Sequence, residues 1–395
     1  MNLERHFSDR AQRMQPLAIR DALRSASRPD IIPFIAGQPA PDLFPAKAIG
    51  YQASQILETK SAAALQYGDS QGYAPLRQWV ANRYPQTSPE QILTISGSQQ
   101  ALDLTAKLFV NPNDKVIVAA PTYAGALSTY QIYGAEYLPV PCDGEGMLPG
   151  PLEAAMQQNP RLVYAIPNFM NPTGVCMSLA RRQHLAALAQ QYDVVIVEDD
   201  PYGELRFEGE RLPNLFELAP NHVLYAGSFS KILAPGLRMG WMIAPAWAKE
   251  KLMIAKQTAD LQSPTYLQYV LAELLEDDFI EQQFARLRDY YRKRRDLMMA
   301  ALTREFPSEA AFACPTGGMF IWCELPAHVN ATELLPQAIE RKVAYMPGAA
   351  FFSDGSGHHT LRLSYTLADE AQINQGIKIL GELFKEAIIR PYTLL

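Results

Sequence analysis

The chain has 395 residues, of which 48% are hydrophobic and 19% are charged. Its formal net charge is −6, from 35 basic and 41 acidic residues, so a nucleic-acid partner has no electrostatic support. No stretch approaches the roughly 20 apolar residues of a membrane helix, and the amino terminus lacks the apolar core of a signal peptide. We therefore expect a soluble, cytoplasmic protein that binds neither nucleic acid nor membrane.

The four cysteines and the pair His358-His359 give no recognisable metal site. No two cysteines form a C-x-x-C pair, and none lies at zinc spacing from a histidine. Adjacent histidines point to different sides of a helix or a strand, so the pair is a poor chelate. We expect reduced thiols and no bound metal.

The first 45 residues begin polar and then become rich in proline, at positions 33, 39, 41 and 45. Proline fixes φ and removes a backbone donor, so neither a long helix nor a central strand fits this run. We predict an amino-terminal arm over residues 1–45, extended and packed with the small domain.

From about residue 90, short apolar runs alternate with amphipathic stretches. Residues 194–197 are nearly all β-branched, which predicts a strand buried on both faces. Alternation of this kind indicates βαβ crossovers, and hence a three-layer αβα domain with a mainly parallel sheet, over residues 46–280. The expected strands are 92–96, 115–120, 137–140, 162–166, 194–197, 222–226 and 238–243, and the expected helices include 98–109 and 179–191.

After about residue 275 the pattern changes. A long, charged amphipathic stretch covers residues 277–306, and its basic run 292–295 is expected to be a solvated helix face. Strands are then expected at 318–325 and 361–365, and helices near 331–341 and 370–388. This looser alternation predicts a smaller α+β domain over residues 281–395, so that the whole chain is of the α/β class.

The segment Ser228-Phe229-Ser230-Lys231 follows a predicted strand and precedes Arg238. It therefore lies at the carboxyl end of a parallel sheet, where open α/β folds bind ligands. The Lys231 amine can form a Schiff base with an aldehyde. The two serine hydroxyls and the Arg238 guanidinium could hold a phosphate. Taken alone, the segment could also be an ordinary polar loop.

Acidic residues follow the most hydrophobic strand, in Glu198-Asp199-Asp200-Pro201-Tyr202. Carboxylates at such a place are costly unless they are paired or functional. One interpretation is a helix cap or a turn. The other is that Asp199 pairs with the protonated ring nitrogen of pyridoxal 5′-phosphate (PLP), which is a far better electron sink in that form. Tyr202 could then reach the phenolic oxygen of the ring.

Three further segments follow predicted strands at the same edge of the sheet. Asn171 lies in a turn-forming segment and could donate its amide to the phenolic oxygen. Ser98 and Gln99 follow Gly97 at a helix start, where backbone N–H groups can face a phosphate, although neither P-loop nor dinucleotide spacing is present. Tyr123 could stack on a flat ring. Each could, alone, be an ordinary turn or core residue.

The combination is more specific than its parts. In chain order the motifs are Gly-Ser-Gln, Pro-Thr-Tyr, Asn-Pro-Thr-Gly, Asp-Asp-Pro-Tyr and Ser-Phe-Ser-Lys, with an arginine seven residues after the lysine. Over nearly its whole length the chain resembles the fold-type I PLP-dependent aminotransferases of classes I and II. It is most similar to the branch with the 2-aminoadipate and kynurenine aminotransferases and related aromatic or branched-chain enzymes.

The resemblance implies an activity. The enzyme would transfer the amino group of an L-amino acid (aromatic, 2-aminoadipate-like or branched/aliphatic) to a 2-oxo acid such as 2-oxoglutarate, with ping-pong kinetics. The amine of Lys231 would bind the cofactor and move the substrate proton, Asp199 would hold the ring nitrogen protonated, and Tyr123 would stack on the ring.

The resemblance also implies two sets of binding residues. Arg362 would grip the substrate α-carboxylate, and Gly37 and Asn171 would lie beside it, although Arg362 taken alone would be an exposed strand residue. Tyr67 would reach the phosphate of the neighbouring subunit, which implies a homodimer. The cofactor-binding set would be Ser98, Gln99, Tyr123, Asn171, Asp199, Tyr202, Ser228, Ser230, Lys231, Arg238 and Tyr67.

Two other functions stay open. A PLP-dependent carbon–sulfur β-lyase would use the same cofactor residues. A non-catalytic effector-binding domain of a transcription regulator would have the same fold, but we expect no room for its DNA-binding domain, because residues 33–45 already match the start of the catalytic fold. We can place no second arginine for a side-chain carboxylate, so a dicarboxylic substrate is also open.

Overall fold

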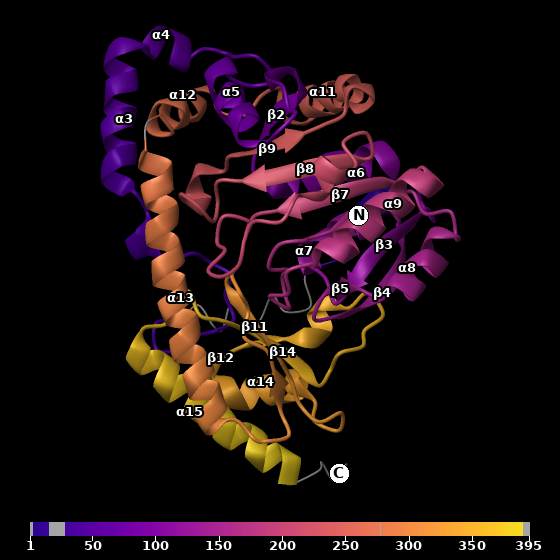
Figure 1. Ribbon diagram of the computed structural model, residues 1–395, viewed down its shortest axis with the longest axis vertical. Helices are drawn as coiled ribbons and strands as arrows, with labels where there is room; N and C mark the ends of the chain where they lie inside the picture. The colour runs from indigo at the N-terminus through magenta and orange to yellow at the C-terminus, as the bar shows by residue number, and fades with distance from the viewer. Residues whose placement is uncertain (1–2, 16–27, 277, 390–395) are drawn as a thin grey trace.

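The computed structural model describes residues 3–15, 28–276 and 278–389 (Figure 1). Its large sheet has eight strands in the order β2-β9-β8-β7-β6-β3-β4-β5. The central strands pair in parallel, whereas β2, β9 and β5 are antiparallel to their neighbours. The bounds are β2 (Ile92–Ile95), β3 (Lys115–Ala120), β4 (Glu136–Asp143), β5 (Gly146–Met147), β6 (Leu162–Ala165), β7 (Val195–Asp200), β8 (Val223–Ser228) and β9 (Gly240–Ile243).

Helices cover both faces of this sheet (Figure 1). On one face, α6 (Ser98–Phe109) and α11 (Ala246–Asp260) form a compact apolar cluster with β2, β8 and β9. The class predicted from the sequence, α/β with a mainly parallel sheet, is confirmed. Strand β7 is buried from Ile196 to its end, as its β-branched composition indicated. The other helices of this part are α7 (Ala124–Ile132), α8 (Pro149–Met156), α9 (Leu179–Tyr192) and α10 (Leu215–Leu218).

A smaller antiparallel sheet, in the order β10-β11-β14-β13, lies in the carboxyl-terminal part of the chain. Helix α13 (Phe279–Glu305) runs past both sheets and packs along α15 (Glu370–Ile389) at its far end (Figure 1). The remaining elements here are β10 (Ala311–Phe312), β11 (Phe320–Glu324), α14 (Ala331–Glu340), β12 (Val343–Ala344), β13 (Met346–Pro347) and β14 (Thr360–Ser364).

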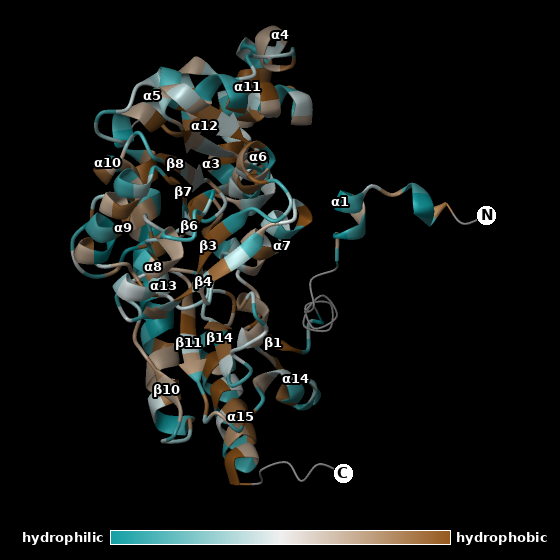
Figure 2. Cartoon of the chain, turned by 90° about the vertical axis from the view of Figure 1, so that its right-hand side faces the viewer, coloured by the Kyte–Doolittle hydropathy of each residue, from teal (hydrophilic) through white to brown (hydrophobic). Residues whose placement is uncertain are grey.

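The amino-terminal arm is not wholly extended. It contains short helical turns at Glu4–His6, α1 (Asp9–Gln12) and Pro41–Leu43. Figure 2 shows α1 at the side of the molecule, and there Arg13 donates to the carbonyl of Ile132 at 3.2 Å and Arg10 lies over the ring of Tyr133 at 4.6 Å. Residues 16–27 lie outside the described part of the chain. Strand β1 (Ile32–Pro33) pairs in parallel with β12 in a separate two-stranded sheet, so this end of the arm is joined to the carboxyl-terminal part of the chain. After the arm, the chain forms α3 (Ala46–Thr59), α4 (Ser61–Ala64) and α5 (Ala74–Arg83), and α12 (Thr265–Leu274) packs on α3.

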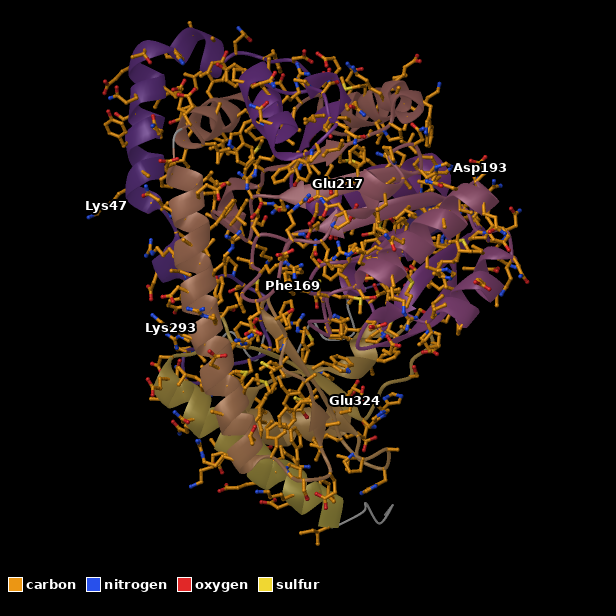
Figure 3. The ribbon with its side chains drawn as sticks, viewed as in Figure 1. Lys47, Phe169, Asp193, Glu217, Lys293 and Glu324 are labelled. Carbon is orange, nitrogen blue, oxygen red and sulfur yellow. The ribbon has the colours of Figure 1, made fainter. Side chains whose placement is uncertain are left out.

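The expectation that residues 292–295 form a solvated helix face is wrong at its last position. Lys293 points outward from α13 and its side chain is 70% exposed (Figure 3). Arg295 turns inward, where it pairs with Glu208 at 2.6 Å and donates to the carbonyl of Pro315 at 2.7 Å. Residues two positions apart lie on nearly opposite sides of a helix. Four consecutive basic residues therefore cannot all lie on one face. Within the described residues, no helix is long and apolar enough to cross a membrane.

Candidate active site

A cavity of about 400 Å³, the catalytic cavity, lies at the carboxyl ends of β7 and β8, opposite β14. Residues from five or more separate segments meet there because parallel strands end at one edge of the sheet. Of the thirteen site residues named from the sequence, twelve line it: Gly37, Ser98, Gln99, Tyr123, Asn171, Asp199, Tyr202, Ser228, Ser230, Lys231, Arg238 and Arg362.

Lys231 lies in the turn after β8, with its amine inside the cavity. The amine donates a hydrogen bond of 2.7 Å to the carbonyl of Gly37. Burial lowers the pKa of Lys231 to about 8, and the positive charges of Arg362 and Arg238 act in the same direction. A lysine of lowered pKa supplies neutral amine near neutral pH, which is the form that attacks an aldehyde or accepts a proton.

Asp199 is buried, and only one of its two carboxylate oxygens accepts a hydrogen bond. Its Oδ2 accepts a hydrogen bond of 2.9 Å from the hydroxyl of Tyr164, and its Oδ1 is buried without a partner. Burial raises the pKa of Asp199 to about 6, and the hydrogen bond from the Tyr164 hydroxyl opposes this rise. A buried unpaired carboxylate oxygen is costly. A protonated ring nitrogen would supply the missing donor, so this residue fits the PLP ring.

A phosphate can be held where α6 begins. Gly97 has φ 77°, and it turns the chain so that the first N–H groups of α6 are free at the cavity wall. The Arg238 guanidinium lies against Gly97, 2.7 Å from where a Cβ would stand, and donates to the carbonyl of Ser96 at 2.9 Å. A larger residue at position 97 would displace the arginine. Free N–H groups beside a guanidinium suit a dianionic phosphate.

Ser228, Ser230 and Gln99 contribute unequally to the proposed phosphate site at the start of α6. The backbone N–H of Ser230 donates to the Ser228 hydroxyl at 3.1 Å, so the two serines form one tight turn at the cavity. The side-chain amide of Gln99 donates instead to Thr129 on α7, at 2.7 Å. Only the backbone of Gln99 is therefore free for a phosphate.

Tyr123 and Tyr202, which would bind the cofactor ring, also line the catalytic cavity. The ring of Tyr123 lies against Gly125, 2.5 Å from where a Cβ would stand, so only glycine leaves it space. Tyr202 is buried and packs edge-on against Phe320, with ring centroids 5.8 Å apart. These contacts fix both tyrosines at the cavity wall, where a flat ring could lie against Tyr123.

Arg362 lies in the middle of β14 and is 3% exposed, so it is not the exposed strand residue that its local sequence indicated. Its guanidinium donates to Asn171 Oδ1 at 2.8 Å and to the carbonyl of Ile35 at 2.7 Å, and its Nε is buried without a partner. Burial lowers the pKa of Arg362 to about 10. No carboxylate among the described residues pairs with it, which leaves the guanidinium suited to a substrate carboxylate.

Tyr67 is the one site residue named from the sequence that lies away from the catalytic cavity. Tyr67 is 79% exposed, follows α4, and does not line the catalytic cavity of its own chain.

Tyr164 was not named from the sequence, because an aromatic residue inside a buried strand looks like core. Only the register of the two strands reveals its role. Strand β6 lies beside β7, and Tyr164 is paired with Val197, two residues before Asp199.

Residues 29–380 match the sequence model of the family described as aminotransferase class I and II. The chain is 40% identical to aromatic-amino-acid aminotransferase 1 of Thermococcus litoralis, over 98% of this chain and 95% of that protein. It is 43% identical to 2-aminoadipate transaminase of Thermus thermophilus, over 96% of each.

A solved structure is also similar. The alpha-aminoadipate aminotransferase of Thermus thermophilus, complexed with N-(5′-phosphopyridoxyl)-L-leucine, has a TM-score of 0.93 and 41% identity, covering 98% of this chain and 100% of that one. The family resemblance read from the motifs is thereby confirmed. The chain belongs to the class I and II aminotransferases, and it is a PLP-dependent transaminase.

Proposed function

We propose that this enzyme transfers the amino group of an aromatic, 2-aminoadipate-like or branched/aliphatic L-amino acid to a 2-oxo acid such as 2-oxoglutarate. The observation that carries the proposal is the meeting of three groups in the catalytic cavity. They are the amine of Lys231 with its lowered pKa, the carboxylate of Asp199 with one oxygen unbonded, and the guanidinium of Arg362, which has no carboxylate partner among the described residues. The names of the relatives support the aromatic and 2-aminoadipate classes, and the phosphopyridoxyl-L-leucine bound in the solved relative supports the branched/aliphatic class.

We assign the cofactor-binding residues from this geometry. Lys231 would bind PLP covalently and Asp199 would contact its ring nitrogen. Asn171 and Tyr202 would contact its phenolic oxygen, and Tyr123 would cover one ring face. The start of α6, the serine turn and Arg238 would hold the phosphate. When bound, the cofactor supplies an electron sink for the carbanion at the substrate Cα.

The reaction then depends on positioning and on one proton. Arg362 and Asn171 hold the substrate α-carboxylate and so fix the direction of the Cα–H bond. The neutral amine of Lys231 accepts the Cα proton and later returns it. Asp199 would hold a proton on the ring nitrogen, because its carboxylate is negatively charged and its Oδ1 is free to accept that proton's hydrogen bond. A second half-reaction with a 2-oxo acid runs the steps in reverse, which gives ping-pong kinetics.

We further propose that the enzyme is a cytoplasmic homodimer in which Tyr67 completes the phosphate site of the neighbouring subunit. The support is its exposure in the single chain, combined with the family resemblance. We also propose the domain division 1–45, 46–280 and 281–395. Its support is the separation of the two sheets and the pairing of β1 with β12.

The test is a panel of L-amino acids, each assayed with 2-oxoglutarate and the PLP-loaded enzyme. We expect turnover with aromatic, 2-aminoadipate or branched/aliphatic donors, and parallel double-reciprocal plots. The control omits the 2-oxo acid: an aminotransferase then consumes about one donor per cofactor and stops. Continued release of ammonia without a 2-oxo acid would instead indicate the carbon–sulfur lyase, and would contradict the proposal.

A further inference from the structure

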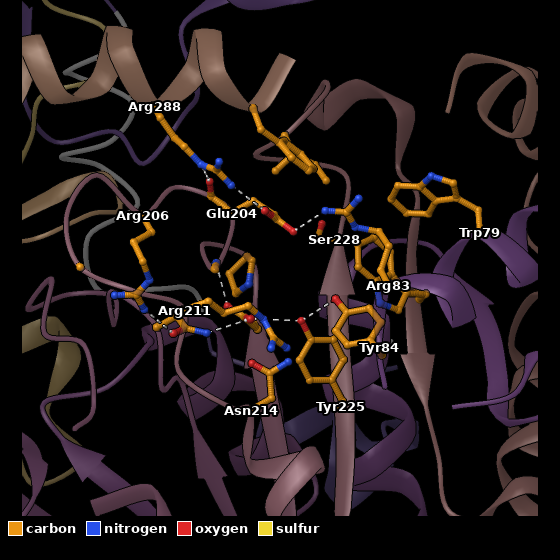
Figure 4. Close-up of a pocket in the computed structure, with 18 residues that line it drawn as sticks. Trp79, Arg83, Tyr84, Glu204, Arg206, Arg211, Asn214, Tyr225, Ser228 and Arg288 are labelled. Carbon is orange, nitrogen blue, oxygen red and sulfur yellow. Dashed lines mark hydrogen bonds and ion pairs between the residues drawn. The ribbon is translucent and has the colours of Figure 1, made fainter. Parts of the chain in front are cut away.

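We propose that a second cavity, separate from the catalytic one, binds a small organic carboxylate. This second cavity has a volume of about 380 Å³ and is lined by residues of α5, α13 and the segment that follows β7 (Figure 4). The transamination described above gives it no role. Its binding chemistry comes from one unpaired arginine, one unpaired amide and a pair of tyrosines.

The two cavities lie on opposite sides of one wall. Successive residues of a strand point to opposite faces, so Asp199 lines the catalytic cavity while Asp200 lines the second. Pro201 and Ser228 line both. A ligand in the second cavity would therefore stand directly behind the serine turn proposed to hold the cofactor phosphate.

Most of the charge in the second cavity is already paired. Arg83 and Arg288 both bind Glu204, each at 2.9 Å. Arg211 pairs with Glu217. Figure 4 shows the pairing of Glu204 with its two arginines at the upper side of the cavity. Arg83 also pairs with Glu281 at 2.8 Å, so the three arginines have three carboxylate partners and need no ligand to balance their charge.

Arg206 is different. It has no carboxylate within ion-pair distance among the described residues, and its guanidinium contacts only Asn168 Oδ1 at 3.3 Å, Cys176 Sγ at 3.3 Å and the ring of Phe169 at 4.8 Å. A half-buried guanidinium without a carboxylate still has free donors in a rigid fork, which matches a carboxylate well. An added carboxylate would supply the missing counter-ion.

The neutral amide of Asn214 lines the same cavity. Asn214 is 3% exposed and points into the second cavity in Figure 4, and its side chain makes no hydrogen bond to another described residue. Asp200 would not repel an anion strongly, because Asn168, Gly203 and Tyr225 all donate to it and burial raises its pKa.

The walls favour a flat anion over a cation. The rings of Tyr84 and Tyr225 lie 5.0 Å apart with their hydroxyls bonded at 2.9 Å, and they form an aromatic wall beside Asn214. The rings of Trp79 and Phe284 are already covered by Arg83, at 5.1 Å from each centroid. The guanidinium of Arg206, which has no carboxylate partner among the described residues, would repel a further cation. The ligand class is therefore a carboxylate on a small flat group.

The first experiment locates the ligand. Crystals of the PLP-loaded enzyme are soaked in 4-bromobenzoate, which has no amino or oxo group and so is not turned over. Anomalous scattering then places the bromine. We expect a peak between Arg206 and Tyr225, with or without a second peak near Arg362. A peak in the catalytic cavity alone, or no peak at all, would overturn the proposal.

The second experiment measures affinity in solution, by calorimetry with 4-bromobenzoate. It uses the PLP-loaded Arg362→Gln enzyme, in which the catalytic cavity has lost the guanidinium that would bind a carboxylate. Adding Arg206→Gln should weaken binding about tenfold to a hundredfold, the range for losing a charged hydrogen bond, and Asn214→Ala should weaken it less.

The matched control is Arg77→Gln. Arg77 is also half-buried and without an acidic partner, but it donates only to the backbone carbonyls of Gly72 and Pro89, outside the second cavity. Its removal should leave the affinity unchanged, and 4-bromotoluene, which lacks the carboxylate, should not bind. Equal affinities for the Arg206→Gln, Asn214→Ala and Arg77→Gln proteins would contradict the assignment.

Discussion

The hydroxyl of Tyr164 donates to Asp199 Oδ2 at 2.9 Å and leaves Asp199 Oδ1 as the only oxygen of that carboxylate free for the cofactor. The two residues lie on neighbouring parallel strands, β6 and β7, whose register brings them together. The tyrosine touches neither substrate nor cofactor in our assignment. It acts through Asp199, whose direction it fixes and whose pKa it lowers.

Replacing this tyrosine should therefore change the chemistry at the cofactor ring. In Tyr164→Phe, Asp199 loses a charge-assisted donor, so its pKa rises and it holds the ring proton less well. We expect kcat to fall about tenfold, since such a hydrogen bond contributes about 1.5 kcal/mol, and the pH dependence of the cofactor absorption band to shift. Tyr130→Phe is the control, because it removes another buried hydroxyl, bonded to Thr105 at 3.1 Å. Equal effects in both variants would indicate a purely structural role.

Removal of the Lys231 amine should abolish both cofactor attachment and turnover. Treatment of the wild type with borohydride should add the mass of reduced cofactor to the peptide that contains Lys231, and Lys231→Ala should gain none. Lys107→Ala, which removes a surface lysine ion-paired with Asp103, should behave as wild type. Residual turnover near the wild-type rate in Lys231→Ala would refute the assignment.

Arg362→Lys should impair substrate binding and leave cofactor binding intact. Lysine keeps the charge but loses the planar fork, so it cannot both bind Asn171 and hold a carboxylate by two bonds. We expect kcat/KM for the amino donor to fall about tenfold to a hundredfold, with the affinity for PLP within about twofold of wild type. A change in PLP affinity of the same size would mean that Arg362 acts mainly on the cofactor.

The sequence predicted most of the large sheet because its strands are apolar runs bounded by Gly, Pro and helix starts. The helix predicted at 98–109 has those same ends in the structure, since Gly97 and the strand before it mark its beginning. The site residues that followed predicted strands, such as Lys231 and Asp199, share one cavity because parallel strands end at one edge.

What the sequence could not predict depends on contacts between distant segments. The burial of Arg362 results from its bonds to Asn171 and Ile35, 191 and 327 positions away in the chain. Tyr164 needed the register of two strands, and the inward turn of Arg295 needed Glu208 on another segment. The motif at Gln99 predicted backbone N–H groups at the phosphate, but the bond from the Gln99 side-chain amide to Thr129, 30 positions away, could not be predicted. None of these pairings leaves a periodic pattern in the sequence.

The burial of Asp199 gives a prediction for stability against pH in the PLP-free protein. Its pKa is about 6 in the folded chain against the ordinary value of 3.8, so between these pH values the folded state binds more protons than the unfolded state. The contribution of Asp199 to the free energy of unfolding therefore falls as pH rises from about 4 to about 6. The 2.2-unit difference corresponds to about 3 kcal/mol as an upper figure.

Asp199→Asn removes this titration, so its free energy of unfolding should vary less over the same pH range than that of the wild type. Urea unfolding of both PLP-free proteins at pH 4, 5, 6 and 7 measures the difference directly. Glu198 and Asp200 also have raised pKa values and the same sign of effect, and both are present in the two proteins. The charge of Asp200 contributes to the raised pKa of Asp199, so the difference between the two curves reports Asp199 together with its coupling to Asp200. Asp42→Asn, at an exposed position, should follow the wild-type curve. If Asp199→Asn also follows it, the carboxylate is not desolvated as the structure indicates.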